Sequence, residues 1–237
     1  MKQEVIQLAR KDKEKLFQLR NRSLISLTNP KSSIAEQFRT VRTSIQFSGI
    51  EADLQSLLVT SPSPAEGKST IAANLAVVFA QQGKRTLFID SDLRKPTVHY
   101  TFHIENHIGL TNILTGQVTL EEAVKTTRQE NLWVLTSGPI PPNPSELLGS
   151  KGMDALLEKA KDEFDLVIFD SPPVLAVTDA QVLSNLTNGV VLVINSGKTK
   201  IDDAKKTKEL LENAKAKILG VVLNNKKEQA NQYYYYE

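Results

Sequence analysis

The chain has 237 residues, 40% of them hydrophobic, and a formal net charge of +2. This length and composition are sufficient for one substantial core, so we expect one domain with appendages. The small net charge gives no indication of nucleic acid as a partner. Because cysteine is absent, disulfides, thiolate metal sites and cysteine nucleophiles are excluded.

The N-terminal residues show neither a signal peptide nor a membrane span. No window approaches 18 consecutive apolar residues, so we expect a soluble chain that is not exported. Residues 1–29 are predicted to form an N-terminal arm, in which 1–23 mix charges with scattered apolar side chains. Such a weakly amphipathic arm can touch an anionic membrane, but a solvated tail is the favoured interpretation.

A helix is predicted after Pro30, where Ser32 or Ser33 can cap it. Its apolar positions follow a helical spacing: Ile34, Phe38, Val41 and Ile45. Another face carries Glu36, Arg39 and Arg42. Glu36 and Arg39 are three residues apart, so an ion pair within the helix explains them without any further role.

Residues 57–70 join an apolar run, a tight loop and an apolar helix, which is the layout of a phosphate-binding P-loop. Backbone N–H groups and the helix N-terminus would hold the phosphates, with Lys68 at the β- and γ-phosphates and Ser69 on Mg²⁺. Pro62 stands at the first glycine position of the usual G-x-x-x-x-G-K-[ST] pattern. The predicted nucleotide-binding residues are Pro64, Ala65, Glu66, Gly67, Lys68, Ser69 and Thr70.

Strand and helix patterns alternate from the P-loop to the end of the chain. Strands are predicted at 55–60, 86–89, 132–136, 166–170, 190–194 and 218–223, and helices at 71–80, 109–114, 120–127, from 145, at 178–187 and at 201–215. This alternation predicts an α/β fold of the P-loop NTPase type, with a mostly parallel sheet covered by helices on both faces.

Acidic residues follow two of the predicted strands. Asp90 and Asp92 end the strand at 86–89, and Asp170 ends the strand at 166–170. The carboxyl ends of parallel strands share one edge of a sheet, where ligands bind. Lys68, Ser69 and the three aspartates therefore predict a site for ATP and Mg²⁺. The alternative for Asp170 alone is a turn cap before two prolines.

Two further patterns receive structural interpretations. His99, His103 and His107 recur at every fourth residue, as metal ligands on a helix would, but Pro96 interrupts a helix there and no acidic ligand completes the set. The proline-rich segment 138–144 is expected to be a rigid connection, with partner recognition as the alternative.

The C-terminus is rich in tyrosine. Four of the five tyrosines are Tyr233, Tyr234, Tyr235 and Tyr236. Residues 226–237 are polar and are predicted to form a flexible tail, so these tyrosines are not core residues. They act either as a docking peptide or as hydroxyl nucleophiles that reach a nucleotide site in the same or a neighbouring chain.

From about Lys31 onwards the sequence resembles the bacterial tyrosine kinases, P-loop kinases that control capsule and exopolysaccharide export. The segments that carry the resemblance are 61–70, 87–96, 136–148, 170–173 and the tyrosine tail. The resemblance implies a kinase domain at 30–225 that phosphorylates its own tail.

Residue roles follow from the same resemblance. Lys68 and Ser69 would bind phosphate and magnesium, Asp90 would be the base toward a tyrosine hydroxyl, and Asp92 and Asp170 would support the metal. In the Glu36, Arg39 and Arg42 pattern the resemblance implies the interface of a ring of subunits that phosphorylate one another's tails. Other proteins with tyrosines would be further substrates.

The resemblance also implies a partner and a location. In the Gram-positive type a separate membrane-spanning protein activates the kinase, so a cytoplasmic protein recruited to the membrane is expected. One departure from the family is Ala65, where glycine is usual; its β-carbon disfavours positive φ by roughly 1–2 kcal/mol and predicts strain or a different loop.

Two other functions remain open at this point. The first is a MinD- or ParA-like assembly ATPase without kinase activity, which has no use for a tyrosine tail. The second is a nucleotide-binding scaffold that Ala65 has made inactive.

Overall fold

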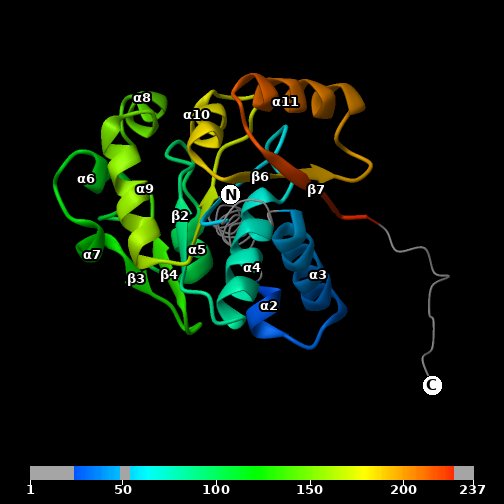
Figure 1. Cartoon of the computed structure of the whole chain (residues 1–237), viewed down its shortest axis with the longest axis horizontal. Coiled ribbons are helices and arrows are strands. Elements are labelled where there is room, and N and C mark those ends of the chain that lie inside the picture. The colour runs from blue at the N-terminus through cyan, green and yellow to red at the C-terminus, as the bar shows by residue number, and fades with distance from the viewer. Residues whose placement is uncertain (1–23, 49–53, 227–237) are drawn as a thin grey trace, which may run out of the picture.

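A seven-stranded sheet organises the part of the chain that the structure, a computed structural model, describes: residues 24–48 and 54–226 (Figure 1). The strand order is β3-β4-β2-β5-β1-β6-β7. The strands are β1 Ser56–Thr60, β2 Thr86–Asp90, β3 Lys125–Thr126, β4 Leu132–Leu135, β5 Leu166–Asp170, β6 Gly189–Asn195 and β7 Ile218–Asn224. All neighbours pair in parallel except β3 and β4. The predicted mostly parallel sheet is confirmed.

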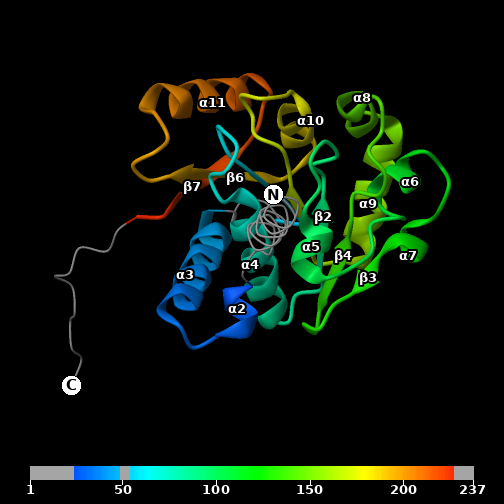
Figure 2. The same cartoon turned by 180° about the vertical axis from the view of Figure 1, so that it is seen from behind.

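Helices cover both faces of the sheet, as Figures 1 and 2 show from opposite sides. One face carries α2 Ile25–Thr28, α3 Ser33–Ser48, α4 Lys68–Gln81 and α5 Val98–Phe102. The other carries α6 Leu110–Leu114, α7 Leu120–Ala123, α8 Pro144–Leu148, α9 Lys151–Glu163, α10 Asp179–Leu186 and α11 Ile201–Asn213. The predicted α/β architecture, with helices on both faces of the sheet, is thereby confirmed.

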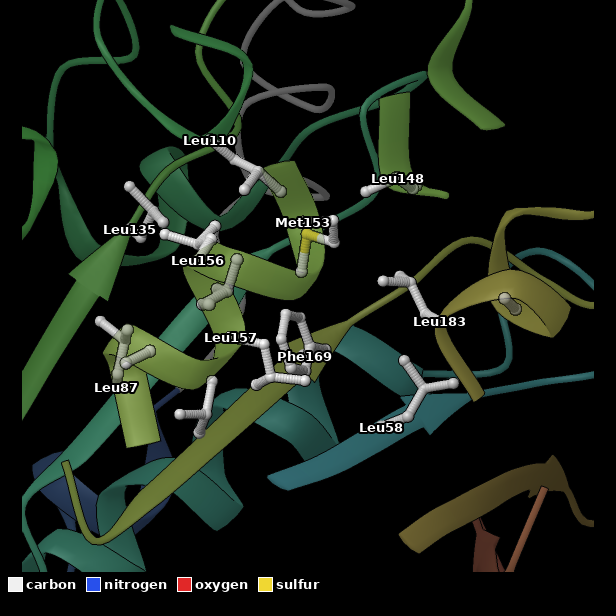
Figure 3. Close-up of a cluster of buried hydrophobic side chains, with 14 of the residues drawn as sticks. Leu58, Leu87, Leu110, Leu135, Leu148, Met153, Leu156, Leu157, Phe169 and Leu183 are labelled. Atoms are coloured by element: carbon white, nitrogen blue, oxygen red, sulfur yellow. The ribbon is translucent and has the colours of Figure 1, made fainter. Parts of the chain in front are cut away.

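The two cores fix the sheet between these layers. On one face α4 is buried along nearly all its length, because small alanines let it lie close against the strands. On the other face Leu156 and Leu157 of α9 pack with Leu87 and Phe169 of the sheet (Figure 3). Burial of one such side chain contributes about 1.5–3 kcal/mol. The strand ends that carry the acidic residues therefore rest on a rigid support.

Two sequence predictions of helices were wrong. The helix expected over 120–127 ends at Ala123, and Lys125–Thr126 forms β3, antiparallel to β4. Val124 is already extended, with ψ 136°, and the β-branched residues that follow it favour a strand at the sheet edge. The helix expected from Ser145 is two helices: α8 begins at Pro144 and α9 at Lys151, with a break at Gly149 and Ser150.

The predicted boundary between arm and domain at residue 29 stays a prediction. Within the described residues, α2 is already packed on α4: the Ser26 backbone N–H donates to Asn74 Oδ1 at 2.9 Å, and Gln81 Nε2 donates to the Ser26 carbonyl at 3.0 Å. Residues 1–23, expected to be a weakly helical arm, lie outside the described part. None of the described helices has the length and apolar character that a membrane span requires.

Candidate functional site

The loop between β1 and α4 has the predicted P-loop shape. Gly67 is the residue before the helix and has φ +91°. This conformation favours glycine, and a β-carbon on Gly67 would lie 2.2 Å from Asn224 Nδ2 and so displace that amide. The backbone of the loop thus turns sharply at Gly67 and presents the N-terminus of a 14-residue helix to a ligand.

Ala65 adopts the left-handed conformation that glycine usually supplies. Its φ is +64°, and its side chain is exposed. The loop is therefore not differently folded; it keeps the P-loop course and carries strain of about 1–2 kcal/mol. Of strain and a different loop, the two outcomes expected from the sequence, the structure shows strain.

The Lys68 ammonium lies among oxygens from three elements. Its Nζ is 3.1 Å from Ser69 Oγ, 3.4 Å from Asp92 Oδ2 and 3.3 Å from Asp170 Oδ1. Lys68 is 9% exposed, Ser69 2% and Asp92 7%, so these groups interact in an environment that excludes most water. Charge interactions are stronger there than at an open surface. The structure thus brings Lys68, Ser69, Asp92 and Asp170 together.

Asp90 lies beside this cluster but has different partners. It is opposite Asp170 on the neighbouring strand and is 0% exposed. Its Oδ2 accepts the backbone N–H groups of Thr97 and Val98, each at 2.9 Å, and its Oδ1 accepts that of Asp92 at 3.3 Å. Burial, and after it the Asp170 carboxylate, raises the pKa of Asp90 to about 7. Asp90 is therefore a group that gains or loses a proton near neutral pH.

Two side chains tie the P-loop to the ends of β6 and β7. Asn224 Nδ2 donates to the Glu66 carbonyl at 2.8 Å, and the Glu66 carboxylate accepts the backbone N–H groups of Ser63 at 3.2 Å and Asn195 at 3.3 Å. Burial raises the pKa of Glu66, while these hydrogen bonds act in the opposite direction. The buried Glu66 side chain thus stabilises the loop by joining its backbone to the end of β6.

A second cluster joins three loops at the same edge of the sheet. Arg94 donates through Nε to Asp179 Oδ2 at 2.9 Å and through Nη2 to Asp179 Oδ1 at 3.0 Å. Ser145 Oγ accepts from Arg94 Nη2 at 3.0 Å and donates to Asp179 Oδ1 at 2.7 Å. Asp179 is 0% exposed, and the hydrogen bonds to it raise the pKa of Arg94.

The face expected to form a ring interface is partly used within the chain. Arg39 Nε pairs with Glu36 Oε2 at 3.0 Å, as the helical spacing indicated, and Arg39 Nη1 donates to the Pro30 carbonyl at 3.0 Å. Arg42 Nη1 donates to the Val78 carbonyl of α4 at 2.7 Å, and burial lowers the pKa of Arg42. Arg42 therefore fastens α3 to α4, while Glu36 is largely exposed.

The three histidines do not share a helix face. His99 lies in α5, His103 ends that helix with φ +54°, and His107 lies in the loop beyond. In the described ranges no three His, Cys, Asp or Glu side chains are grouped as a metal site. The proline-rich segment 138–144 connects β4 to α8 and exposes Ile140. The tyrosines at 233–236 lie outside the described residues.

Sequence reasoning missed the supporting residues. Asn195 and Asn224 end β6 and β7 at the sheet edge that carries Asp90 and Asp170, so the rule that identified the aspartates also applies to them. The partner of Arg94 is 85 residues further along the chain, and no local pattern indicates such a pairing. Asp179 resembles an ordinary acidic residue in the first turn of a helix.

The donor set fits Mg²⁺ bound together with a phosphate ligand. The buried carboxylates of Asp92 and Asp170 lie within 3.4 Å of one ammonium, and the buried Asp90 carboxyl lies beside them, so the site has negative charge that a divalent cation would balance. Carboxylate and hydroxyl oxygens are the ligands that Mg²⁺ prefers, and it commonly takes only one or two carboxylates plus phosphate oxygens. Binding of Mg²⁺ therefore does not require that all three carboxylates coordinate it.

Comparisons with known proteins agree with the fold described above. A family model described as AAA domain matches residues 65–226. The tyrosine-protein kinase YwqD of Bacillus subtilis (strain 168) is 54% identical over 216 residues, 91% of each chain. The crystal structure of the chimerical protein CapA2B2 has a TM-score of 0.84 and 48% identity, covering 86% of this chain and 90% of that one.

A more distant similarity extends to cell-division ATPases. The septum site-determining protein MinD of Pyrococcus horikoshii OT3, complexed with Mg-ADP, has a TM-score of 0.62 and 25% identity, and the match covers 71% of this chain and 69% of that one. The domain is thus of the nucleotide-binding P-loop type.

Proposed function

The chain belongs to the bacterial tyrosine-protein kinases, which phosphorylate protein tyrosines, and on this premise we propose that phosphoryl transfer from ATP takes place around Lys68. The observation that carries the proposal is the placement of the Lys68 ammonium within 3.4 Å of Ser69, Asp92 and Asp170 at the mouth of a P-loop. MinD-like assembly activity receives less support, because the similarity to MinD is weaker in identity and coverage.

The chain's own groups divide the work in the following way. Residues 64–70 form the phosphate-binding loop, in which the backbone N–H groups from Ala65 onwards and the start of α4 hold the phosphates. Lys68 neutralises charge on the β- and γ-phosphates as the phosphoryl group moves. Ser69, Asp92 and Asp170 would hold Mg²⁺, which when bound neutralises phosphate charge. Such a site acts mainly by positioning and electrostatic stabilisation.

The transferred group passes from ATP to a tyrosine hydroxyl. The tyrosine oxygen forms a bond to the γ-phosphorus, the bond from that phosphorus to the bridging oxygen breaks, and ADP leaves. The hydroxyl proton goes to the Asp90 carboxylate, whose pKa of about 7 leaves it ionised at slightly alkaline pH. A tyrosine hydroxyl has a pKa near 10, so the proton moves as the new bond forms rather than beforehand.

Asp92 is the competing candidate for the base, because it is slightly exposed and lies next to Lys68, whereas Asp90 is fully buried. The pH dependence of kcat separates the two. If Asp90 is the base, the kcat of the wild-type protein falls as the pH drops through about 7, which is the acid limb of its pH profile. The low residual kcat of Asp90→Asn should then lack this acid limb. If Asp90→Asn retains the limb while Asp92→Asn loses it, the base is Asp92.

The acceptor is the tail, and we propose that it is phosphorylated between chains. The test mixes two variants: Lys68→Met, which keeps the tail but lacks the ammonium, and a protein with phenylalanine at 233–236, which keeps the site but lacks acceptors. Phosphotyrosine on the Lys68→Met chain supports transfer in trans. Label that appears only in wild-type protein, at a rate independent of concentration, supports transfer within one chain.

A ring assembly would use the exposed part of α3. Glu36 and Arg39 can exchange their pairing for one across an interface, and Arg42 would act by holding α3 in place. Light scattering tests this: Glu36→Ala with Arg39→Ala should give monomers with normal stability. A ring that persists in that double variant contradicts the proposed interface. Phosphates on the tail would add charge and loosen the ring.

The kinase would act in the cytoplasm at the membrane, activated by a membrane-spanning partner, and would control exopolysaccharide or capsule synthesis. This part rests on the family resemblance and on the similarity to a CapA2B2 chimera. Adding a cytoplasmic fragment of the partner should raise the rate of tail labelling several-fold. An unchanged rate would contradict activation by that fragment.

A further inference from the structure

The cluster of Arg94, Asp179 and Ser145 joins the loops that follow β2, β4 and β5. Arg94 lies in the loop after β2, two residues beyond Asp92; Ser145 lies in α8, which follows the loop after β4; and Asp179 begins α10, which follows Asp170 and its loop. Asp92 of the proposed site lies in the first of these loops, and Asp170 is the residue directly before the third. A connection between them at this place bears directly on the geometry of that site.

The loop from Ser91 to Thr97 is held at both sides. On one side the Asp90 carboxylate accepts the N–H groups of Thr97 and Val98. On the other side the Arg94 guanidinium grips Asp179 with two parallel hydrogen bonds. Such a paired contact fixes both distance and orientation, unlike a single ion pair. Asp92 lies between these two anchors.

The position of the Asp92 carboxylate depends on that loop. Its Oδ1 accepts the backbone N–H of Lys95 at 3.0 Å, next to Arg94, and its Oδ2 lies 3.4 Å from Lys68 Nζ. Leu93, between Asp92 and Arg94, is 0% exposed. Without the hydrogen bonds from Arg94 to Asp179, the segment that carries Asp92 and the Lys95 N–H is no longer held to the start of α10.

We infer that Arg94 is a positioning residue for phosphoryl transfer. Through its hydrogen bonds to Asp179 and Ser145 it fixes the position of the Asp92 carboxylate and of the loop after Asp170. The inference rests on the proposed role of Asp92 in the site. Arg94 itself is assigned no contact with nucleotide. Supporting residues around metal ligands typically change metal affinity or activity by 10–100-fold when replaced.

The test uses the full chain and compares Arg94→Lys and Arg94→Ala with a matched pair. Arg85 and Asp165 form a similar contact, with Arg85 Nε at 3.3 Å and Nη2 at 3.1 Å from Asp165 Oδ1, at the opposite ends of β2 and β5. Arg85→Lys and Arg85→Ala therefore remove an arginine–aspartate contact between the segments that precede β2 and β5, away from the site. Tail phosphorylation is measured against ATP and, separately, against Mg²⁺ concentration.

The expected result is a split between the two titrations. Both Arg94 variants should lower kcat by about 10-fold or more and raise the Mg²⁺ concentration for half-maximal activity, with the KM for ATP changed by less than about three-fold, since the P-loop holds the nucleotide. The Arg85 variants should match wild type. A merely structural role would reduce the folded fraction and leave both half-saturation values unchanged, and that result overturns the inference.

Two further measurements keep the proposal testable. If Arg94→Ala does not fold, as judged by circular dichroism, Ser145→Ala is used instead, because it removes only one hydroxyl group of the cluster and should raise the Mg²⁺ requirement by a smaller factor. An unchanged Mg²⁺ requirement in both Arg94→Lys and Ser145→Ala overturns the inference. Asp92→Asn distinguishes a failure of the positioning role of Arg94 from a failure of the proposed role of Asp92. If it is inactive while the Arg94 variants are normal, only the positioning role fails; if it is fully active, the proposed role of Asp92 fails first.

Discussion

Ala65 is the point at which the loop departs from its family, and replacing it with glycine gives a calculable change. The residue has φ +64° and an exposed side chain, so removing its methyl group relieves strain and costs no packing. Relief of the left-handed conformation stabilises the folded state by about 1–2 kcal/mol. The greater freedom of glycine in the unfolded chain offsets about 0.4–1 kcal/mol of that.

The net expectation for Ala65→Gly is a stabilisation of about 0.5–1 kcal/mol, or a rise in Tm of about 1–4 °C for a domain of this size. Thermal unfolding by circular dichroism, with and without ADP, measures it. The matched control is Ala204→Gly in α11, where the backbone is helical and the same change should destabilise by about 1 kcal/mol. A drop in Tm for Ala65→Gly as large as that of the control would refute the strain argument.

The other predictions concern the supports of the loop and the buried acid. Gly67→Ala should weaken ADP binding measured by calorimetry by 10-fold or more, because φ of +91° strains any residue with a β-carbon and that carbon would displace the Asn224 amide 2.2 Å away; binding within two-fold of wild type would contradict this reasoning. Asn224→Ala loses the hydrogen bond to the Glu66 carbonyl, so ADP should bind several-fold more weakly, in keeping with about 1 kcal/mol for one hydrogen bond, and unchanged affinity would show that the loop keeps its shape without it. The pKa of Asp90 is raised from 3.8 to about 7, so the folded state keeps a proton that the unfolded state loses; this group therefore favours folding at low pH, and its contribution declines as the pH rises from about 4 to about 7. Relative to Asp90→Asn, wild-type Tm should fall over that window, and parallel curves would contradict the raised pKa.

The sheet and its acidic edge could be predicted from sequence because local patterns specify them. Runs such as residues 166–169 are apolar because both faces of a parallel strand are covered, and the residue after this run, Asp170, marks the edge where ligands bind. Gly67, Lys68 and Ser69 identify a loop whose chemistry depends on backbone more than on distant contacts. The fold class, and the grouping of Lys68, Ser69, Asp92 and Asp170 at one edge of the sheet, could therefore be predicted from neighbours in the chain.

What could not be predicted depends on partners far apart in sequence or on weak local preference. The break between α8 and α9 and the short strand β3 arise where propensities are nearly balanced and tertiary contacts decide. The pairing of Arg94 with Asp179 and the bond from Asn224 to the P-loop cross 85 and 158 residues. Conversely, the family resemblance implied a role between subunits for Arg42, whereas in the structure Arg42 donates a hydrogen bond to the Val78 carbonyl within the domain.

The most direct test of the central claim is to incubate the purified full chain with labelled ATP, Mg²⁺ and the activator fragment, and to map the label by mass spectrometry. Wild-type protein should carry phosphate on tyrosines 233–236, and Lys68→Met, which lacks the ammonium 3.3 Å from Asp170, should carry none. Release of ADP and inorganic phosphate without phosphotyrosine would contradict the account and indicate an assembly ATPase instead.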